Sequence, residues 1–229
     1  MVGDLPKMFF VFVKTLVWEY FEERRVRAQF YQNHSFKKAD QYLKKIYKFQ
    51  SPFRVSKKFL IRKGVKDVHC YGETPLTTLN LIAQKVNIKA TDHILELGCG
   101  RGRSLFFLAS MYGCRVSGVE WIPEFVLNSL SVARGCRDLS LSFYLANMAE
   151  FPLDGPSIIY LYGTCLSEDL ILSLGANMSR LPPHVKIITV SYPLSDYHPN
   201  SFTIIDQFSV QFNWGQADVF IQNSTASMC

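Results

Sequence analysis

Three glycines at alternate positions, Gly98, Gly100 and Gly102, follow an apolar run and precede a helical pattern over residues 104–112. Glycine permits a tight turn and a close approach of the backbone to a ligand. The N-terminus of a helix presents unpaired N–H groups that bind polar and anionic ligands. The stretch therefore predicts a strand-to-helix corner that holds a nucleotide or a nucleoside-like cofactor. It departs from the dinucleotide pattern Gly-x-Gly-x-x-Gly, because Arg103 stands in the place of the third glycine.

An acid further along the chain falls where a ribose would need one. Residues 115–120 are expected to form a strand that ends in Glu120, which lies 24 residues after Glu96. This is close to the offset of about 20 residues for an acid that binds ribose hydroxyls. A carboxylate accepts from both hydroxyls at once, and the indole of Trp121 would cover an adenine face. The alternative for Glu120 is a solvated strand end.

The pattern Glu96-x-Gly98-x-Gly100-x-Gly102 resembles the first motif of class I S-adenosylmethionine-dependent methyltransferases. The resemblance implies that S-adenosylmethionine is the cofactor and that the glycines pass under its methionine end. In that class an acid after the third strand often accepts from the adenine amino group. Asn147 holds that place here, and its amide oxygen or backbone groups of Met148 would make the contact. The resemblance thus assigns to cofactor binding Glu96, Gly98, Cys99, Gly100, Gly102, Glu120, Trp121, Asn147 and Met148.

Two further stretches resemble protein lysine methyltransferases of this class. A Glu-Thr-Pro turn before the first strand approaches the cofactor in such enzymes, and residues 71–75 here read Tyr-Gly-Glu-Thr-Pro. The run Ile-Ile-Tyr-Leu-Tyr at 158–162 is similar to their Val-Tyr-x-Tyr run. An ordinary helix-capping turn is the alternative for 71–75. On the resemblance, the residues expected to line the acceptor side are Tyr71, Glu73, Thr74, Tyr160 and Tyr162.

The elements that must position these residues alternate between strand and helix patterns. Strands are expected at the apolar run before Gly98 and at 115–120, 141–145, 157–162 and 185–190, with a last pair over 202–212 and 217–222. Helices are expected at 77–86, 104–112, 123–133 and 166–181. This order predicts an α/β fold with a doubly wound, mostly parallel seven-stranded sheet and an antiparallel C-terminal hairpin. The methyltransferase domain is assigned to residues 71–229.

Residues 1–70 are expected to form a basic helical N-terminal extension. They carry 16 Lys and Arg against 6 acids, whereas residues 71–229 carry 9 against 13. Apolar residues recur at helical spacing over 8–31. One interpretation is a peripheral, interfacial membrane helix. The other is a helix packed on the body or on a second subunit. Basic and aromatic residues over 57–66 leave a nucleic-acid contact open.

The six cysteines show no Cys-x-x-Cys spacing, and no metal site is expected. This usage favours a reducing, cytoplasmic compartment, with membrane association left open. The apolar run at 8–13 is too short for a membrane span. The chain also lacks the Asn- or Asp-Pro-Pro-Tyr motif of amino-methylating nucleic-acid enzymes.

These features predict an S-adenosylmethionine-dependent methyltransferase whose acceptor is a protein, with a lysine amine as the first hypothesis. The alternatives are a small-molecule or RNA methyltransferase, and a non-catalytic Rossmann-like binding module with a basic docking arm. The sequence leaves open the acceptor, the oligomeric state and the identity of any catalytic base.

Overall fold

A seven-stranded sheet forms the centre of the computed structural model, which describes the backbone of residues 5–226 and the side chains of residues 13–226. The strand order is β3-β2-β1-β4-β5-β7-β6, in which β7 runs antiparallel to both β5 and β6 and the other four pairs are parallel. The strands are β1 (His93–Leu97), β2 (Arg115–Glu120), β3 (Leu141–Leu145), β4 (Ile158–Leu161), β5 (Lys186–Val190), β6 (Phe202–Gln211) and β7 (Gln216–Ser224). The predicted α/β fold with an antiparallel C-terminal hairpin is therefore confirmed.

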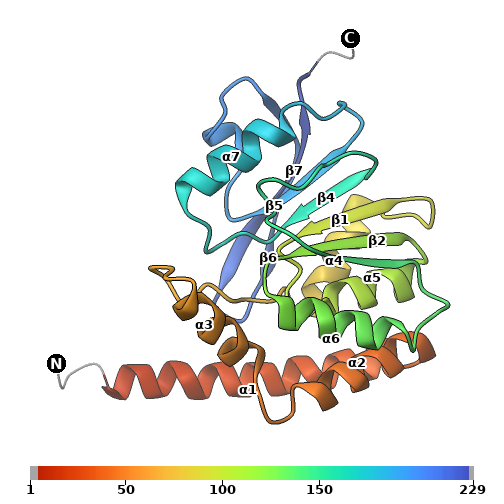
Figure 1. Cartoon of the computed structure of the whole chain (residues 1–229), viewed down its shortest axis with the longest axis vertical. Helices are drawn as coiled ribbons and strands as arrows, with labels where there is room; N and C mark the ends of the chain where they lie inside the picture. The colour runs from red at the N-terminus through yellow and green to blue at the C-terminus, as the bar shows by residue number, and fades with distance from the viewer. Residues whose placement is uncertain (1–4, 227–229) are drawn as a thin grey trace.

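Helices cover the two faces of the sheet unequally (Figure 1). One face packs against α4 (Leu76–Val86), α5 (Arg103–Tyr112) and α6 (Pro123–Ala133), and the other packs against α7 (Glu168–Met178) and a short 3-10 turn, Leu194–Asp196. The central strands β1 and β4 are buried on both faces and are apolar except at His93 and Glu96, as expected for parallel strands that are covered on both sides. In β1, for example, Ile94 packs on the α5 side and Leu95 on the α7 side.

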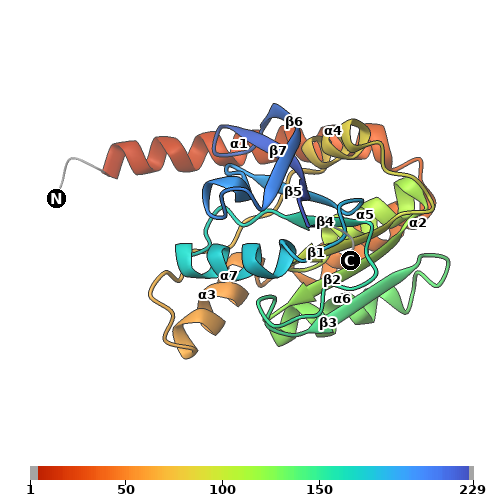
Figure 2. The same ribbon diagram turned by 90° about the horizontal axis from the view of Figure 1, so that it is seen from above.

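Three further helices precede this body: α1 (Leu5–Phe30), α2 (His34–Ile46) and α3 (Pro52–Arg62). Figure 1 and Figure 2 show α1 and α2 as a layer beyond α5 and α6. The α2 side chains Phe36 and Leu43 have no exposed surface, and the ring of Phe36 lies 5.4 Å from that of Phe107 in α5. The domain boundary expected at residue 70 therefore does not coincide with a break in packing, because both parts share one apolar core.

None of the helices over residues 5–226 has the length and apolar character needed to cross a membrane.

Candidate active site

The glycine-rich stretch forms the predicted corner between β1 and α5. Gly98, Gly100 and Gly102 all have positive φ, at 77°, 53° and 71°, a region that favours glycine. The backbone N–H of Gly98 donates to the carbonyl of Val119 at 2.9 Å, which ties the turn to the end of β2. Helix α5 begins directly after Gly102 and directs its N-terminus at this turn.

Glu120 lies over the corner at the carboxyl end of β2. Its Oε2 accepts from the backbone N–H of Gly100 and its Oε1 accepts from that of Ile122, each at 2.8 Å. Burial raises the pKa of Glu120, and backbone donors of Ile122, Gly100 and Trp121 oppose that effect. Each carboxylate oxygen keeps a further lone pair, so the fixed carboxylate has the acceptor capacity that ribose hydroxyls require.

A cavity of about 790 Å³ opens beside Glu120 at the carboxyl ends of the parallel strands. Ligands bind at this end of open α/β sheets, and the volume lies within the ~300–1,000 Å³ of small-molecule sites. The predicted residues that line it are Tyr71, Gly98, Gly100, Glu120, Trp121, Asn147, Met148 and Tyr162. A cofactor with a ribose, an aromatic base and a polar tail therefore fits the donors and walls that are present.

Glu96 is buried at the head of a smaller pocket that adjoins the cavity at Gly98. Burial raises the pKa of this carboxyl to about 7, although the hydroxyl of Ser104 donates to it and lowers the value. The nearby charges of Glu73 and Glu120 raise it further. Glu96 can therefore change its charge near neutral pH.

The turn at 71–75 is fastened to the glycine corner. Arg101 donates to both carboxylate oxygens of Glu73, from Nε at 2.6 Å and from the terminal nitrogen at 2.8 Å, and the hydroxyl of Tyr71 also donates to this carboxylate. Burial alone would raise the pKa of Glu73, but the charge of Arg101 outweighs it and holds the pKa below its usual value. Glu73 is thus a structural anion rather than a base. Its pairing with Arg101 was not predicted from the sequence.

The predicted acceptor-side residues divide into two groups. Tyr162 lines the cavity and receives a hydrogen bond from Trp214 Nε1 at 2.9 Å. Tyr160 is buried below the cavity, where its hydroxyl lies 2.6 Å from that of Thr74. Tyr160 therefore supports the turn instead of facing a ligand, and Thr74 lines only the smaller pocket.

Three residues that were assigned to the cofactor have other local roles. The amide oxygen of Asn147 accepts from the backbone N–H of Ala149 at 3.1 Å, and its nitrogen donates to Glu150 at 2.8 Å. Its side chain thus shapes the turn after β3. Gly102 lies outside the cavity lining, where its lack of a side chain admits the ring of Phe143. The thiol of Cys99 is buried against Gly118 in β2.

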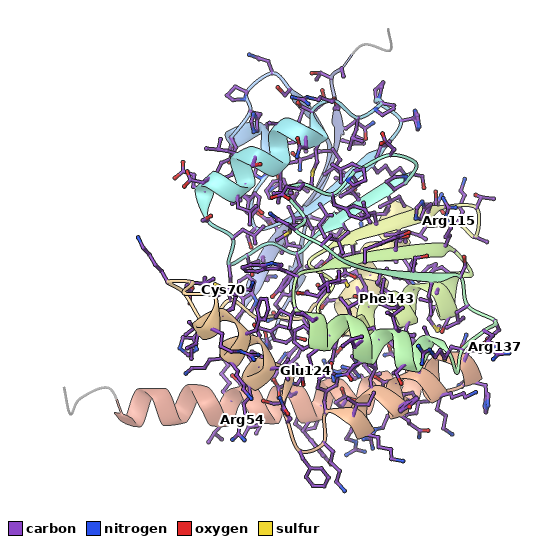
Figure 3. All side chains as sticks on the ribbon, viewed as in Figure 1. Arg54, Cys70, Arg115, Glu124, Arg137 and Phe143 are labelled. Atoms are coloured by element: carbon purple, nitrogen blue, oxygen red, sulfur yellow. The ribbon has the colours of Figure 1, made fainter. Side chains whose placement is uncertain are left out.

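One wall of the cavity was not predicted, because residues 56–70 were assigned to a separate extension. Helix α3 and the segment after it supply Leu60, Val65, Asp67 and Cys70, and Figure 3 labels Cys70 on this segment. The loop into α7 and the first turn of that helix form the opposite wall, with Thr164, Cys165, Leu166, Ser167 and Leu170. The apolar residues Leu60 and Val65 give the only sequence signal for the wall formed by α3 and the segment after it.

Comparison with known proteins places this geometry in a class. No protein-family model matches the chain. It is 28% identical over 145 residues to a histone-lysine N-methyltransferase, H3 lysine-79 specific, from Dictyostelium discoideum, which covers 57% of this chain and 8% of that protein. It is 27% identical over 126 residues to phosphoethanolamine N-methyltransferase 1 of Zea mays, which covers 54% of this chain and 25% of that one. The chain thus matches only a small part of either relative's length.

Among solved structures, an RNA methyltransferase from Salinibacter ruber in complex with S-adenosyl-L-homocysteine superposes with a TM-score of 0.55 at 19% identity. The match covers 69% of this chain and 96% of that one. Sheet order, glycine corner and these likenesses together define a class I S-adenosylmethionine-dependent methyltransferase fold. S-adenosylmethionine is the cofactor of that class, and the residues at the β1–α5 corner fit it.

Proposed function

We propose that this chain transfers a methyl group from S-adenosylmethionine to a protein lysine amine. The observation that carries the proposal is the fixed carboxylate of Glu120 beside the glycine turn, in a cavity of about 790 Å³ that extends to walls formed by α3 and α7. The likeness of its sequence to a lysine-specific methyltransferase supports the choice of acceptor.

When bound, the cofactor supplies a methyl group on a positively charged sulfur, which is already activated for displacement. The residues of the chain therefore need only to bind, orient and exclude water. Glu120 would accept from the ribose hydroxyls, and the Tyr71 and Tyr162 side chains would border the reacting groups. The largely apolar walls disfavour an ammonium ion and favour the neutral amine, which is the form able to attack. No general base is assigned, since Glu73 is paired with Arg101.

A small amine is the second candidate for the acceptor. The match to phosphoethanolamine N-methyltransferase 1 covers 25% of that relative, whereas the match to the lysine-specific methyltransferase covers 8% of that protein. An exposed acid in the cavity wall, Asp67, would attract either a lysine ammonium or a small cationic amine before it loses its proton.

A labelling experiment separates these acceptors. Purified protein would be incubated with methyl-labelled S-adenosylmethionine and a cell extract, and the label would be followed into protein, RNA, lipid and small-molecule fractions. Methyllysine in hydrolysed protein supports the proposal, whereas label in a small amine supports the second candidate. Label lost on ribonuclease treatment would contradict both. Labelling should be abolished in the Glu120→Ala variant. The control is Glu124→Ala, which changes an exposed acid outside the cavity and should leave labelling unaltered.

A further inference from the structure

Helix α1 presents two opposite faces. Glu22, Val26 and Phe30, which are four residues apart, are buried against the body. On the other side of the helix, the large apolar side chains at the i, i+3, i+4, i+7 and i+8 positions are 39% to 59% exposed. We refer to these five residues as the outer stripe: Val13, Leu16, Val17, Tyr20 and Phe21.

The outer stripe leads directly into positive charge. Arg24 and Arg27 follow Tyr20 at the i+4 and i+7 positions of the same helix face and are exposed. The guanidinium carbon of Arg24 lies 6.0 Å from the centre of the Tyr20 ring. A single face of α1 therefore offers an apolar half and a basic half.

Few carboxylates lie on this face of α1. Glu22 turns to the body, where its carboxylate accepts from the backbone N–H of Thr77 at 3.0 Å and from its hydroxyl. Glu23 pairs with Arg103 at 2.6 Å. Between residues 13 and 27, Glu19 is the one exposed acid. The same contacts fix the C-terminal half of α1 to the body, so the outer stripe stays exposed. Figures 1 and 2 show α1 along the outside of the molecule.

We propose that this face of α1 docks on an anionic lipid bilayer. An interfacial helix buries an apolar stripe at the acyl boundary and places Arg and Lys at the headgroups, and the outer stripe with Arg24 and Arg27 has this arrangement. Residues 1–70 carry ten more basic than acidic side chains, and this positive charge is complementary to an anionic surface. A second copy of the chain would instead bring the same basic residues together. The proposal is independent of the acceptor and of the proposed function.

Vesicle sedimentation of the full-length protein tests this docking. Phosphatidylcholine vesicles with and without phosphatidylserine would be used at low and high salt. We expect the protein to sediment with the anionic vesicles, and binding to weaken as salt rises. The double variant L16E/V17E should lower the partition coefficient about tenfold or more. The matched control is L127E/I205E, two exposed apolar residues on α6 and β6, which should bind like the unaltered protein.

The variants sit at exposed positions, so thermal melting should show that all of them fold. Equal loss of binding in the test and control variants would overturn the proposal. Absence of binding to anionic vesicles would also overturn it. Light scattering provides a third arm: a dimer that L16E/V17E converts to a monomer, without lipid binding, would assign the outer stripe to a second copy instead.

Discussion

Asp40 in α2 and Arg103 at the first position of α5 form a buried ion pair. The Nε of Arg103 donates to Asp40 Oδ1 at 2.7 Å, and the Asp40 side chain has no exposed surface. Burial alone would raise the pKa of Asp40, but the charges of Arg103 and Lys44 outweigh it and hold the pKa well below its usual range. The N-terminal helices are therefore fastened at the cofactor corner itself.

Replacing Asp40 with Asn should destabilise the protein by about 3 kcal/mol, because Arg103 would lose a charged partner in a buried site. Urea unfolding at neutral pH measures this. Because the folded pKa is depressed, the contribution of the carboxylate is present above the unfolded pKa and is lost as pH falls below it. The difference between Asp40→Asn and the unaltered protein should therefore shrink in acid. The exposed Asp154→Asn variant serves as the control, and equal stability of the two variants at neutral pH would refute the role of the pair.

Glu96 should make stability depend on pH in the opposite sense. Its folded pKa of about 7 lies above the ordinary value of 4.5, so between these values the unfolded chain has released a proton that the folded chain keeps. The free energy of unfolding should then fall by roughly 3 kcal/mol as pH rises through this window. Glu96→Gln removes the titrating group, so its stability should exceed that of the unaltered protein increasingly from pH 4.5 to 7. Parallel pH profiles of the two proteins would show that the group is not perturbed.

Substitutions at Gly102 and Gly64 distinguish the effect of backbone strain on stability from the effect of packing. Both have positive φ, at 71° and 68°, but a Cβ at Gly64 meets no atom within 4 Å. At Gly102 a Cβ would lie 3.1 Å from Ser129 Oγ and closer still to the Phe143 ring, which Figure 3 labels. Gly64→Ala should cost about 1 kcal/mol from the left-handed backbone alone. Gly102→Ala should cost about 1–3 kcal/mol more through overpacking. Equal melting temperatures for the two variants would contradict this reading.

The sequence predicted the elements whose signals are local. The β1 corner and the acid at the end of β2 are consecutive patterns of strand, glycine and helix, and the structure has them where expected. Tyr160 and Tyr162 would share one face of the strand predicted over 157–162, but β4 ends at Leu161, so only Tyr162 lies beyond the strand and lines the cavity. Placing that strand end correctly would have separated the two tyrosines.

The missing parts of the site depend on packing between distant segments. Arg101 pairs with Glu73 across 28 positions and Arg103 with Asp40 across 63, and no local pattern records such pairs. For the same reason the wall formed by α3 was assigned to a separate extension. The cytoplasmic location and the acceptor stay predictions.

Calorimetric titration with S-adenosylmethionine and S-adenosylhomocysteine tests the central claim most directly. The account predicts micromolar binding of at least one of them, and binding about tenfold or more weaker in Glu120→Ala, because the ribose hydroxyls would lose a charged acceptor. The control Glu124→Ala should bind like the unaltered protein. Absence of binding by a protein that melts cooperatively would contradict the account and leave the fold as a non-catalytic binding module.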